Sequence, residues 1–292
     1  MKFLITGASG QLGREWCMML ENSGHEFIGL SSASLDIRDA TLVQNRLRTF
    51  TPDILINCAA YTNVDKAEDE AGKAHAVNKT GVKHLAFVCR SMGIRLVHYS
   101  TDYVFSGAKE DRSNYPDGYP EDAFRSPVNL YGESKYAGEL TLEESGCDYL
   151  LLRVSWLCGA HGSNFVRKIL ELSETREELA VVEDQIGSPA FTFDVAEKSL
   201  ELLRQNRSGT FHVSSSGVLS WADLAEEVFR LNGISTNVRR VPSSEYQTIA
   251  KRPSYSLLSK QKLEAVGIKA LEWKSGLKRL LNEIGTENSR KP

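Results

Sequence analysis

The sequence predicts an α/β protein in which a doubly wound parallel sheet is followed by a smaller mixed α/β lobe. Short apolar runs alternate with amphipathic stretches of helical period along the first half of the 292 residues. The apolar runs are continuous rather than alternating, which is typical of strands that helices bury on both faces. Right-handed crossovers between such strands favour one sheet with helices on each side.

The elements of the first half follow one another with short connections. Strands are expected at residues 2–6, 26–32, 53–60, 95–101 and 148–156, and helices at 10–24, 39–50, 70–93 and around 131–139. Gly24 and Gly93 are placed to end their helices, and Pro52 stops the helix before it. The segment 106–127 is rich in Gly, Pro, Asp and Ser, so we expect a long polar loop there.

Beyond Trp156 the pattern is less regular. Helices are expected at 164–174, 193–206 and 220–233, and strands at 179–185 and 209–215. Ser220 and Gly233 mark the ends of the last helix. We therefore expect a first domain at 1–155 that a later segment at about 190–215 rejoins, a second lobe at 156–285, and a frayed polar tail at 286–292.

Composition excludes several classes of protein. The net charge of −3 argues against a nucleic-acid surface. No apolar run approaches the roughly 20 residues that span a bilayer, and the chain enters a strand without a leader segment, so we expect a cytoplasmic protein with no membrane partner. The five cysteines are scattered, which fits buried thiols in a reducing compartment rather than disulfides or zinc ligands.

A glycine-rich loop joins the first strand to the first helix. Gly7, Gly10 and Gly13 follow the pattern G-x-x-G-x-x-G. Such glycines allow a tight turn, let the backbone approach a pyrophosphate and bring the helix close to the strand, while the helix N-terminus faces the phosphates. A purely structural turn is the alternative, but the strand–loop–helix setting favours a dinucleotide site. The first domain is therefore expected to be a Rossmann domain that binds NAD(P).

The sequence leaves the choice between NADH and NADPH open. Residues 29–32 read Gly-Leu-Ser-Ser, so the second strand ends without the acid that would bind a ribose 2′-hydroxyl. Arg14 could reach a 2′-phosphate, although a solvated helix residue is the simpler interpretation. Asp36 and Ile37 lie where a carboxylate and an apolar neighbour could hold adenine, and a helix-capping Asp is an equal alternative.

A tyrosine and a lysine four positions apart indicate a proton-transfer site. Tyr131 and Lys135 lie on one helix face. The pKa of a phenol, about 10, is too high for easy transfer near neutrality, and an adjacent lysine cation is expected to lower it. Ser100, Thr101 and Asp102 end a strand at the edge where such sheets bind ligands. A surface Tyr and a solvated Lys are the alternative, which the nearby glycine loop disfavours.

Several stretches together resemble one family. "GASGQLG", "STDYVFSG", "SPVNLYGESKYAGE", "VVEDQIGSP" and "RPSYSLL" occur in the order typical of the dTDP-4-dehydrorhamnose reductase family, in the extended short-chain dehydrogenase/reductase superfamily. The similarity runs over residues 1–284. It implies that NADPH or NADH delivers hydride to the C4 ketone of a dTDP-linked 4-keto-6-deoxy sugar, with dTDP-4-dehydro-L-rhamnose as the first choice, in polysaccharide biosynthesis.

The resemblance also implies roles for individual residues. Tyr131 would donate the proton, Lys135 would hold the ribose, and Thr101 would bind the ketone oxygen, with Asp102 and Trp156 on the sugar. The implied cofactor contacts are Gly7, Gly10, Gln11, Leu12, Gly13, Asp36, Ile37, Ala60, Tyr61 and Thr62, together with Tyr131 and Lys135. Further candidates for the sugar nucleotide are Val64, Asp65, Gln185 and Arg252.

Some of these assignments have structural alternatives. Asp65 could cap a helix, Arg252 could form a surface ion pair, and Trp221 is expected in the core rather than in the site. Some relatives dimerise around magnesium held by acids, and Glu15 matches one such position, but one matched acid does not carry that assembly over. Both a monomer and a homodimer therefore stay open.

Three other functions stay open. One is a reductase of a different dTDP-4-keto sugar, which would use the same site chemistry. Another is a non-catalytic NADP-binding subunit, as in the regulatory subunit of methionine adenosyltransferase, and the third is an epimerase that recycles its NAD. The presence of Thr101, Tyr131 and Lys135 speaks against the non-catalytic alternative.

Overall fold

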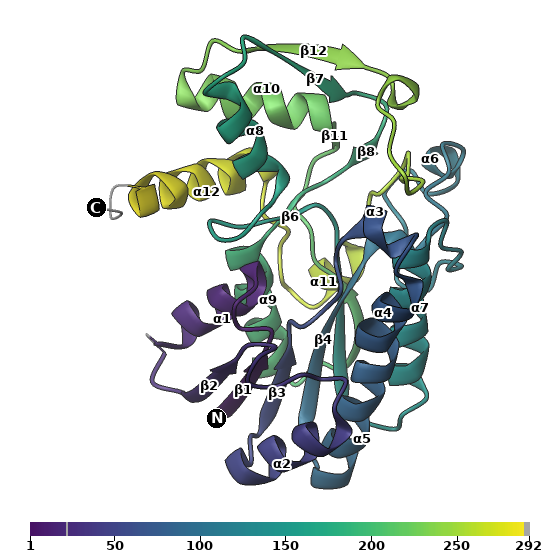
Figure 1. Ribbon diagram of the computed structural model, residues 1–292, viewed down its shortest axis with the longest axis vertical. Coiled ribbons are helices and arrows are strands. Elements are labelled where there is room, and N and C mark those ends of the chain that lie inside the picture. The colour runs from purple at the N-terminus through teal and green to yellow at the C-terminus, as the bar shows by residue number, and fades with distance from the viewer. Residues whose placement is uncertain (22, 289–292) are drawn as a thin grey trace.

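Six parallel strands form the central sheet within residues 1–21 and 23–288, which this computed structural model describes (Figure 1). Their spatial order is β10-β5-β4-β3-β1-β2. They are β1 (Lys2–Thr6), β2 (Glu26–Leu30), β3 (Ile54–Asn57), β4 (Arg95–Thr101), β5 (Tyr149–Val154) and β10 (Gly209–His212). The chain switches direction across the sheet between β1 and β3, which places a ligand crevice at their carboxyl ends. The predicted doubly wound fold is confirmed.

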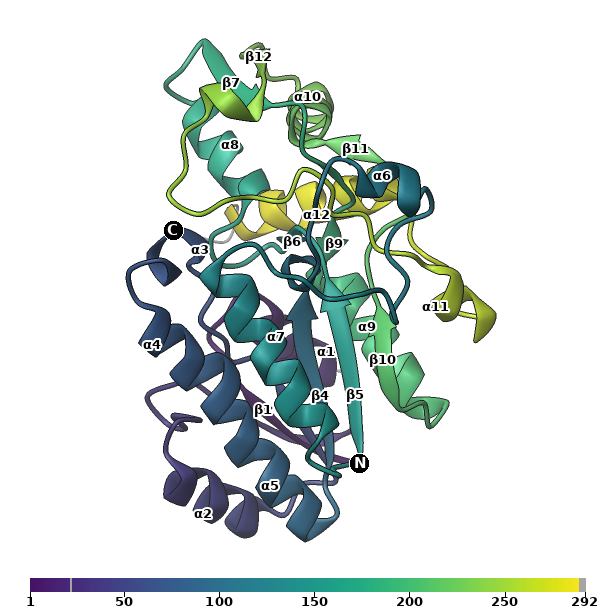
Figure 2. The same ribbon diagram turned by 90° about the vertical axis from the view of Figure 1, so that its right-hand side faces the viewer.

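Helices cover both faces of this sheet (Figure 2). On one face α1 (Gln11–Glu21) packs against α9 (Thr192–Arg204), and on the other α2 (Ala40–Phe50), α5 (Val82–Met92) and α7 (Leu130–Glu143) pack together. Successive strand residues point to opposite faces, so Phe3 and Ile5 join the first layer and Leu4 joins the second. Burial on both faces explains the continuous apolar runs of the strands.

The long helix expected at 70–93 is not uniform. It consists of α4 (Ala71–His75), a π-helical segment η1 (Ala76–Gly81) and α5, and the short α3 (Val64–Ala67) precedes it. Asn78 in the π-helical segment is buried, and its side chain bonds the Tyr61 backbone and the Ser134 hydroxyl. The Asn78 carbonyl lies so close to α7 that a Cβ at Gly138 would be 2.1 Å from it. The π-helical segment and Gly138 therefore allow α7 to pack closely against α4 and α5.

The second lobe lies above the carboxyl edge of the sheet (Figure 1). Its helices are α8 (Phe165–Ser173), α10 (Trp221–Asn232) and α12 (Trp273–Asn288), and a parallel pair of strands, β7 (Glu178–Val182) and β12 (Asn237–Val241), packs on α10. Short pairs join β6 (Leu157–Cys158) to β9 (Ala190–Phe191) and β8 (Ile186–Gly187) to β11 (Leu219–Ser220). A capping box of Ser220 and Asp223 starts α10, and Gly233 ends it with φ 64°.

The predicted loop at 106–127 contains one short helix. This helix is α6 (Asp111–Asn114). Other connections contain η2 (Asp102–Val104), η3 (Ser243–Glu245) and α11 (Gln261–Ala265). Tyr119 anchors the loop because its ring is buried and stacks on Phe105 at 4.4 Å between ring centroids. The segment is therefore packed against the ends of the strands, which its polar composition did not indicate.

Two predicted elements include residues that the structure does not describe. We expected fraying from residue 286, whereas α12 continues to Asn288, and 289–292 lie outside the described residues, as does Asn22 near the end of the helix expected at 10–24. Among the helices that the structure describes, none has the length and apolar character needed to cross a membrane.

Candidate active site

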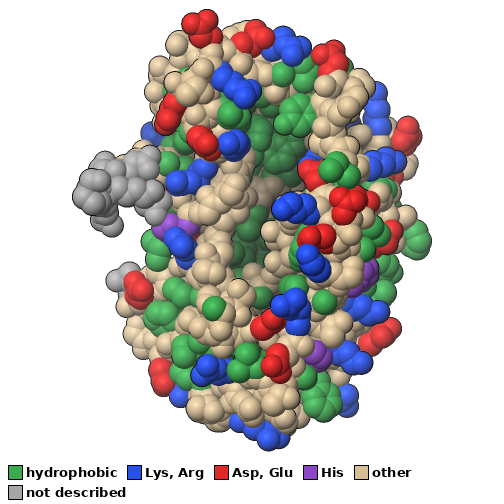
Figure 3. All heavy atoms as spheres, viewed as in Figure 1, with side chains coloured by type: hydrophobic (Ala, Val, Ile, Leu, Met, Phe, Trp, Pro, Cys, Tyr) green, Lys and Arg blue, Asp and Glu red, His purple; other side chains and the backbone are tan. Residues whose placement is uncertain are grey.

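A cleft of about 610 Å³ opens at the carboxyl ends of the central strands, below the second lobe. Figure 3 shows this hollow on the face of the molecule, with apolar side chains visible inside it. The structure brings together many of the predicted site residues here, from segments far apart in the sequence. Those that line the cleft are Gly10, Gln11, Leu12, Ala60, Thr62, Val64, Thr101, Asp102, Tyr131, Lys135 and Trp156.

The three loop glycines serve different purposes. Gly7 has φ 65°, and a Cβ there would lie 2.6 Å from the Ala59 backbone nitrogen after β3. A Cβ at Gly13 would lie 2.2 Å from the Gly7 carbonyl oxygen, so α1 can approach the loop only without a side chain. At Gly10 the Gly7 carbonyl oxygen, 3.3 Å away, is the nearest atom met. Gly7 and Gly13 are thus required by the fold, while Gly10 faces the cleft.

Gln11 joins the glycine loop to the second lobe. Its Nε2 donates to the Ser163 carbonyl at 3.1 Å, and its Oε1 accepts from Asn164 Nδ2 at 2.9 Å. Asn164 is also the N-cap of α8, since its side chain accepts from the Arg167 backbone. The loop is therefore held in place from both sides of the cleft.

The start of α7 positions the tyrosine and the lysine. Asn129 caps the helix by accepting from Gly132 N at 2.8 Å, and its Nδ2 donates to the Lys251 carbonyl at 2.8 Å. The Tyr131 ring meets the Tyr103 ring edge-on, with centroids 5.5 Å apart. Lys135 is only 2% exposed, and its Nζ donates to the Tyr99 carbonyl at 2.7 Å.

The ionisation of these groups differs from the prediction in one respect. Burial, and next the Asp102 charge, raise the pKa of the Tyr131 phenol, while a hydrogen bond with Thr101 acts in the opposite direction. The expected lowering of this pKa by Lys135 is therefore wrong for this arrangement, because burial dominates. Burial lowers the pKa of Lys135 to about 8, which Glu139 partly opposes. Near neutrality the phenol keeps its proton and the lysine its charge, which is the state that a proton donor needs.

The Thr101 hydroxyl and the Asp102 carboxyl lie near Tyr131 at the end of β4. Thr101 is buried; its hydroxyl donates to Asp102 Oδ1 at 2.9 Å and accepts from Tyr103 N at 3.2 Å. Burial raises the pKa of the Asp102 carboxyl to about 6. Ser100, also buried, lies beneath the same edge.

Some predicted cofactor residues do not line this cleft. The Ile37 side chain is 3% exposed and packs in the core beside α5, and Asp36 forms a forked ion pair with Arg38, 2.6 Å at its shortest. The Tyr61 hydroxyl donates to Glu70 at 2.9 Å, which directs it toward α4. The adenine contacts of Asp36 and Ile37 and the cofactor contact of Tyr61 stay predictions.

A second cavity, of about 410 Å³, adjoins the cleft and shares Tyr103, Phe165 and Trp221 with it. Gln185 and Arg252, the two residues predicted for the nucleotide, both line this cavity. Together the two cavities make one groove whose shared wall is aromatic. The sequence motifs did not reveal a role for Tyr103 or Phe165, although Tyr103 lies inside "STDYVFSG".

Asp65 and Arg252, each predicted to contact the sugar nucleotide, form an ion pair with each other. Arg252 NH2 lies 2.6 Å from Asp65 Oδ2, and Ala250 N donates to Asp65 Oδ1 at 3.1 Å. The ion pair that was the alternative for Arg252 is therefore present, whereas Asn63 rather than Asp65 caps α3. The carboxylate fixes the segment before Arg252, so that the guanidinium stands at the wall of the second cavity.

Two tryptophans stack at the junction of the two cavities. The Trp156 and Trp221 rings are 3.7 Å apart at an angle of 15°. Trp156 has φ 49°, a conformation that costs a non-glycine residue about 1–3 kcal/mol, and such strain clusters at functional sites. Trp221 packs against the apolar cluster of the second lobe, as expected, but it also lines the groove. Assigning it to the core alone was therefore wrong.

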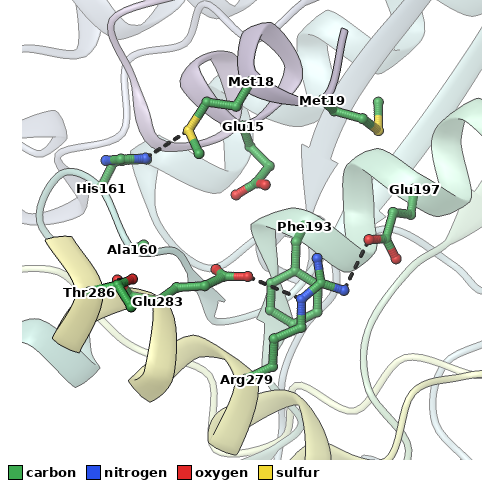
Figure 4. A pocket seen from close by; sticks show the side chains of 10 residues that line it. All are labelled: Glu15, Met18, Met19, Ala160, His161, Phe193, Glu197, Arg279, Glu283 and Thr286. Carbon is green, nitrogen blue, oxygen red and sulfur yellow. Dashed lines mark hydrogen bonds and ion pairs between the residues drawn. The ribbon is translucent and has the colours of Figure 1, made fainter. Parts of the chain in front are cut away.

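Glu15 lies elsewhere, in a cavity of about 310 Å³ between α1, α9 and α12 (Figure 4). Its carboxylate accepts from Thr192 at 2.7 Å. Glu197 and Glu283, which also line the cavity, are each 3.0 Å from Arg279. Arg279 thus pairs with two of the three acids that line the cavity, and within the described ranges no group of three His, Cys, Asp or Glu side chains could hold a metal ion.

The fold and the cleft define the class of protein. A doubly wound parallel sheet, a glycine-rich loop after β1, and Thr101, Tyr131 and Lys135 in one cleft characterise NAD(P)-dependent oxidoreductases of the extended short-chain dehydrogenase/reductase type. The three residues supply a hydroxyl, a phenol and an ammonium, which suits proton transfer to a carbonyl oxygen.

Comparisons with known proteins identify the family. The model of the RmlD substrate binding domain family matches residues 1–286. The chain is 40% identical to the spore coat polysaccharide biosynthesis protein SpsK of Bacillus subtilis (97% of each chain covered) and 38% identical to a dTDP-4-keto-6-deoxy-D-glucose reductase of Streptomyces niveus (99% of each). A crystal structure of dTDP-4-dehydrorhamnose reductase from Bacillus anthracis in complex with NADP superposes with a TM-score of 0.92, at 37% identity over 97% of this chain and 99% of that one. The chain therefore belongs to the RmlD family, as the motifs predicted.

Proposed function

We propose that this protein is an NAD(P)H-dependent reductase that converts dTDP-4-dehydro-L-rhamnose to dTDP-L-rhamnose. One observation carries the proposal: the glycine loop and the Thr101, Tyr131 and Lys135 side chains line the same cleft. A dinucleotide on the loop and a proton donor on α7 then act on the same carbonyl group. The names of the relatives point to dTDP-linked keto sugars as the substrate class.

The residues of the cleft divide the work of reduction. NADPH or NADH, when bound, supplies the hydride, and Gly10, Gln11 and Leu12 are the residues that would hold its pyrophosphate at the start of α1. Lys135 holds the ribose, and Tyr131 gives its proton to the C4 oxygen. Negative charge grows on that oxygen during the reaction, so donors placed there stabilise the transition state more than the ground state.

The second cavity suits the dTDP end of the substrate. Arg252 presents a guanidinium that can bind a diphosphate through two parallel hydrogen bonds. Gln185 offers amide groups to a base, and Tyr103 and Trp221 provide aromatic surface for it. Because this cavity adjoins the cleft, a nucleotide there would leave the sugar beside Tyr131.

The test is a reduction assay with purified protein. dTDP-4-keto-6-deoxy-L-lyxo-hexose is mixed with NADH or NADPH, and cofactor oxidation is followed by the loss of absorbance. We expect turnover with at least one cofactor, and the ratio of the two rates reports the preference. No oxidation with either cofactor, from protein that binds NADPH, would reject the proposal.

A reductase of another dTDP-4-keto sugar is the second candidate, favoured by the names of two similar proteins. SpsK is named for spore coat polysaccharide, and the Streptomyces protein for dTDP-4-keto-6-deoxy-D-glucose. A panel of dTDP-4-keto sugars separates the candidates by kcat/KM.

All five cysteines are free, which supports the proposal of a reducing compartment such as the cytoplasm.

A further inference from the structure

A buried ionic network lies behind the site, and the roles proposed above do not use it. The Glu139 carboxylate on α7 is fully buried. Arg153 from β5, itself 1% exposed, donates to it through Nε and NH2, both at 2.9 Å. Arg125 donates to Glu139 Oε2 at 2.9 Å and reaches Glu143 at 2.6 Å. Desolvating such a group is costly, and apolar side chains of equal volume are often as stabilising, so stability alone does not account for it.

Glu139 stands one helical turn from the lysine of the site. Residues four apart on a helix lie on one face with about 6 Å between their Cβ atoms, so Lys135 and Glu139 are neighbours on α7. Both side chains are almost entirely out of water. In such surroundings charges are weakly screened, and the Glu139 charge opposes the effect of burial on the pKa of Lys135.

Among the residues that the structure describes, the other groups around Lys135 offer it no comparable counter-charge. His98 on β4 is buried, and burial together with Lys135 holds its pKa well below the usual value, so it is neutral. Tyr131 keeps its proton, and Asp102 acts on Tyr131 at the mouth of the cleft. Arg153 on β5 and Arg125 add positive charge behind Glu139. In the layer that packs on α7, the charged residues Lys73, Lys79 and Lys83 are exposed, while His75 and His84 are half-buried.

We propose that Glu139 is a positioning residue for the reduction: its carboxylate, fixed by Arg153 and Arg125, keeps the Lys135 ammonium charged in a dry site. The inference rests on the proposed function, because it assigns Lys135 to the cofactor ribose and to the support of Tyr131. Arg153 fixes the carboxylate through two hydrogen bonds from a strand, so its direction relative to Lys135 does not depend on a mobile surface group.

The test is the pH dependence of catalysis and of cofactor binding. In the wild type, kcat/KM should fall above about pH 8 as Lys135 loses its proton. Glu139→Gln removes the favourable charge and leaves two guanidinium groups nearby, so this alkaline limb should move down by about 1–2 pH units. Glu139→Asp keeps the charge and should restore the limb. The dissociation constant of NADPH, followed by fluorescence, should weaken over the same pH range.

Two further variants provide a control and a second, independent test. Glu143→Gln removes a carboxylate of the same network that lies about 12 Å along the helix from Lys135, so the limb should stay in place. Arg125→Gln removes an opposing cation whose side chain reaches the surface, and the limb should move to higher pH. If Glu139→Gln does not fold, Arg125→Gln tests the inference instead. An alkaline limb of kcat/KM that does not move in Arg125→Gln would overturn the inference.

The outcomes separate this inference from the proposed function. An active wild type, with a Glu139→Gln variant that is slower by the same factor at every pH, would mean that Glu139 is only structural. A wild type inactive on every dTDP-keto sugar, whose NADPH affinity still shows the predicted shifts between variants, would reject the function and retain the inference.

Discussion

Two glycines of the same loop should respond differently to substitution by alanine, one by losing stability and the other by losing cofactor affinity. A methyl group at residue 13 would lie 2.2 Å from the Gly7 carbonyl oxygen and 2.7 Å from the Ala8 Cα, whereas ordinary contacts begin near 3.4 Å. The loop and α1 must therefore separate by about 1 Å. Overpacking of this kind costs about 1–3 kcal/mol, and improved helix propensity returns at most about 1 kcal/mol. Gly13→Ala should lower the melting temperature by several degrees, at about 2–4 °C per kcal/mol.

Gly10→Ala should leave the fold intact and weaken the cofactor. The added methyl group meets only the Gly7 carbonyl oxygen, at 3.3 Å, which a small adjustment relieves. It projects where the proposed pyrophosphate approaches the backbone, so NADPH affinity should fall roughly 10–100-fold, or about 1.4–2.8 kcal/mol. Thermal unfolding and a fluorescence titration with NADPH measure the two effects separately.

A matched control is available in α4, on the other face of the sheet. Gly72 lies in α4, where a Cβ would meet no atom within 4 Å, so Gly72→Ala should leave NADPH affinity unchanged and should not lower the melting temperature, because helix propensity favours alanine by at most about 1 kcal/mol. The reasoning fails if Gly10→Ala binds NADPH like the wild type, or if Gly13→Ala melts at the same temperature as Gly72→Ala.

Three more predictions test the site. Tyr131→Phe should lower turnover by about 10²–10⁴-fold and leave NADPH affinity unchanged, since only the proton donor is lost; near-normal turnover would contradict the assignment. Arg252→Gln should raise KM for the sugar nucleotide roughly tenfold with little change in kcat, whereas Arg240→Gln, in an exposed ion pair of the same lobe, should have no effect; equal effects of the two would refute a specific role. Burial raises the pKa of Asp102 from 3.8 to about 6, so the native state binds this proton more tightly than the unfolded chain, and the stability it contributes is lost as pH rises through 6. Asp102→Asn should therefore be stabilised relative to the wild type by about 2–3 kcal/mol more at pH 8 than at pH 4 in urea unfolding, and a difference that does not depend on pH would count against a buried titrating carboxyl.

Much of the first domain was predictable because its signals are local. The strand–glycine loop–helix unit at the N-terminus spans about twenty residues, and its turn, period and cap each involve neighbours in the chain. The same holds for α10, whose N-cap and closing glycine were visible as Ser220 and Gly233. The π-helical segment at 76–81 was not visible, because it depends on Asn78 reaching Tyr61 and Ser134 in other elements.

The sequence by itself therefore determined the sheet with its covering helices, the glycine loop, and the common face of Tyr131 and Lys135. Only the tertiary structure decided that Asp65 pairs with Arg252, 187 positions away, and that Trp156 stacks on Trp221. It also decided that burial, rather than Lys135, sets the pKa of the Tyr131 phenol. The physical reason is that turns and helical periods depend on residues close in the chain, whereas ion pairs, ring stacking and desolvation depend on which distant segments pack together.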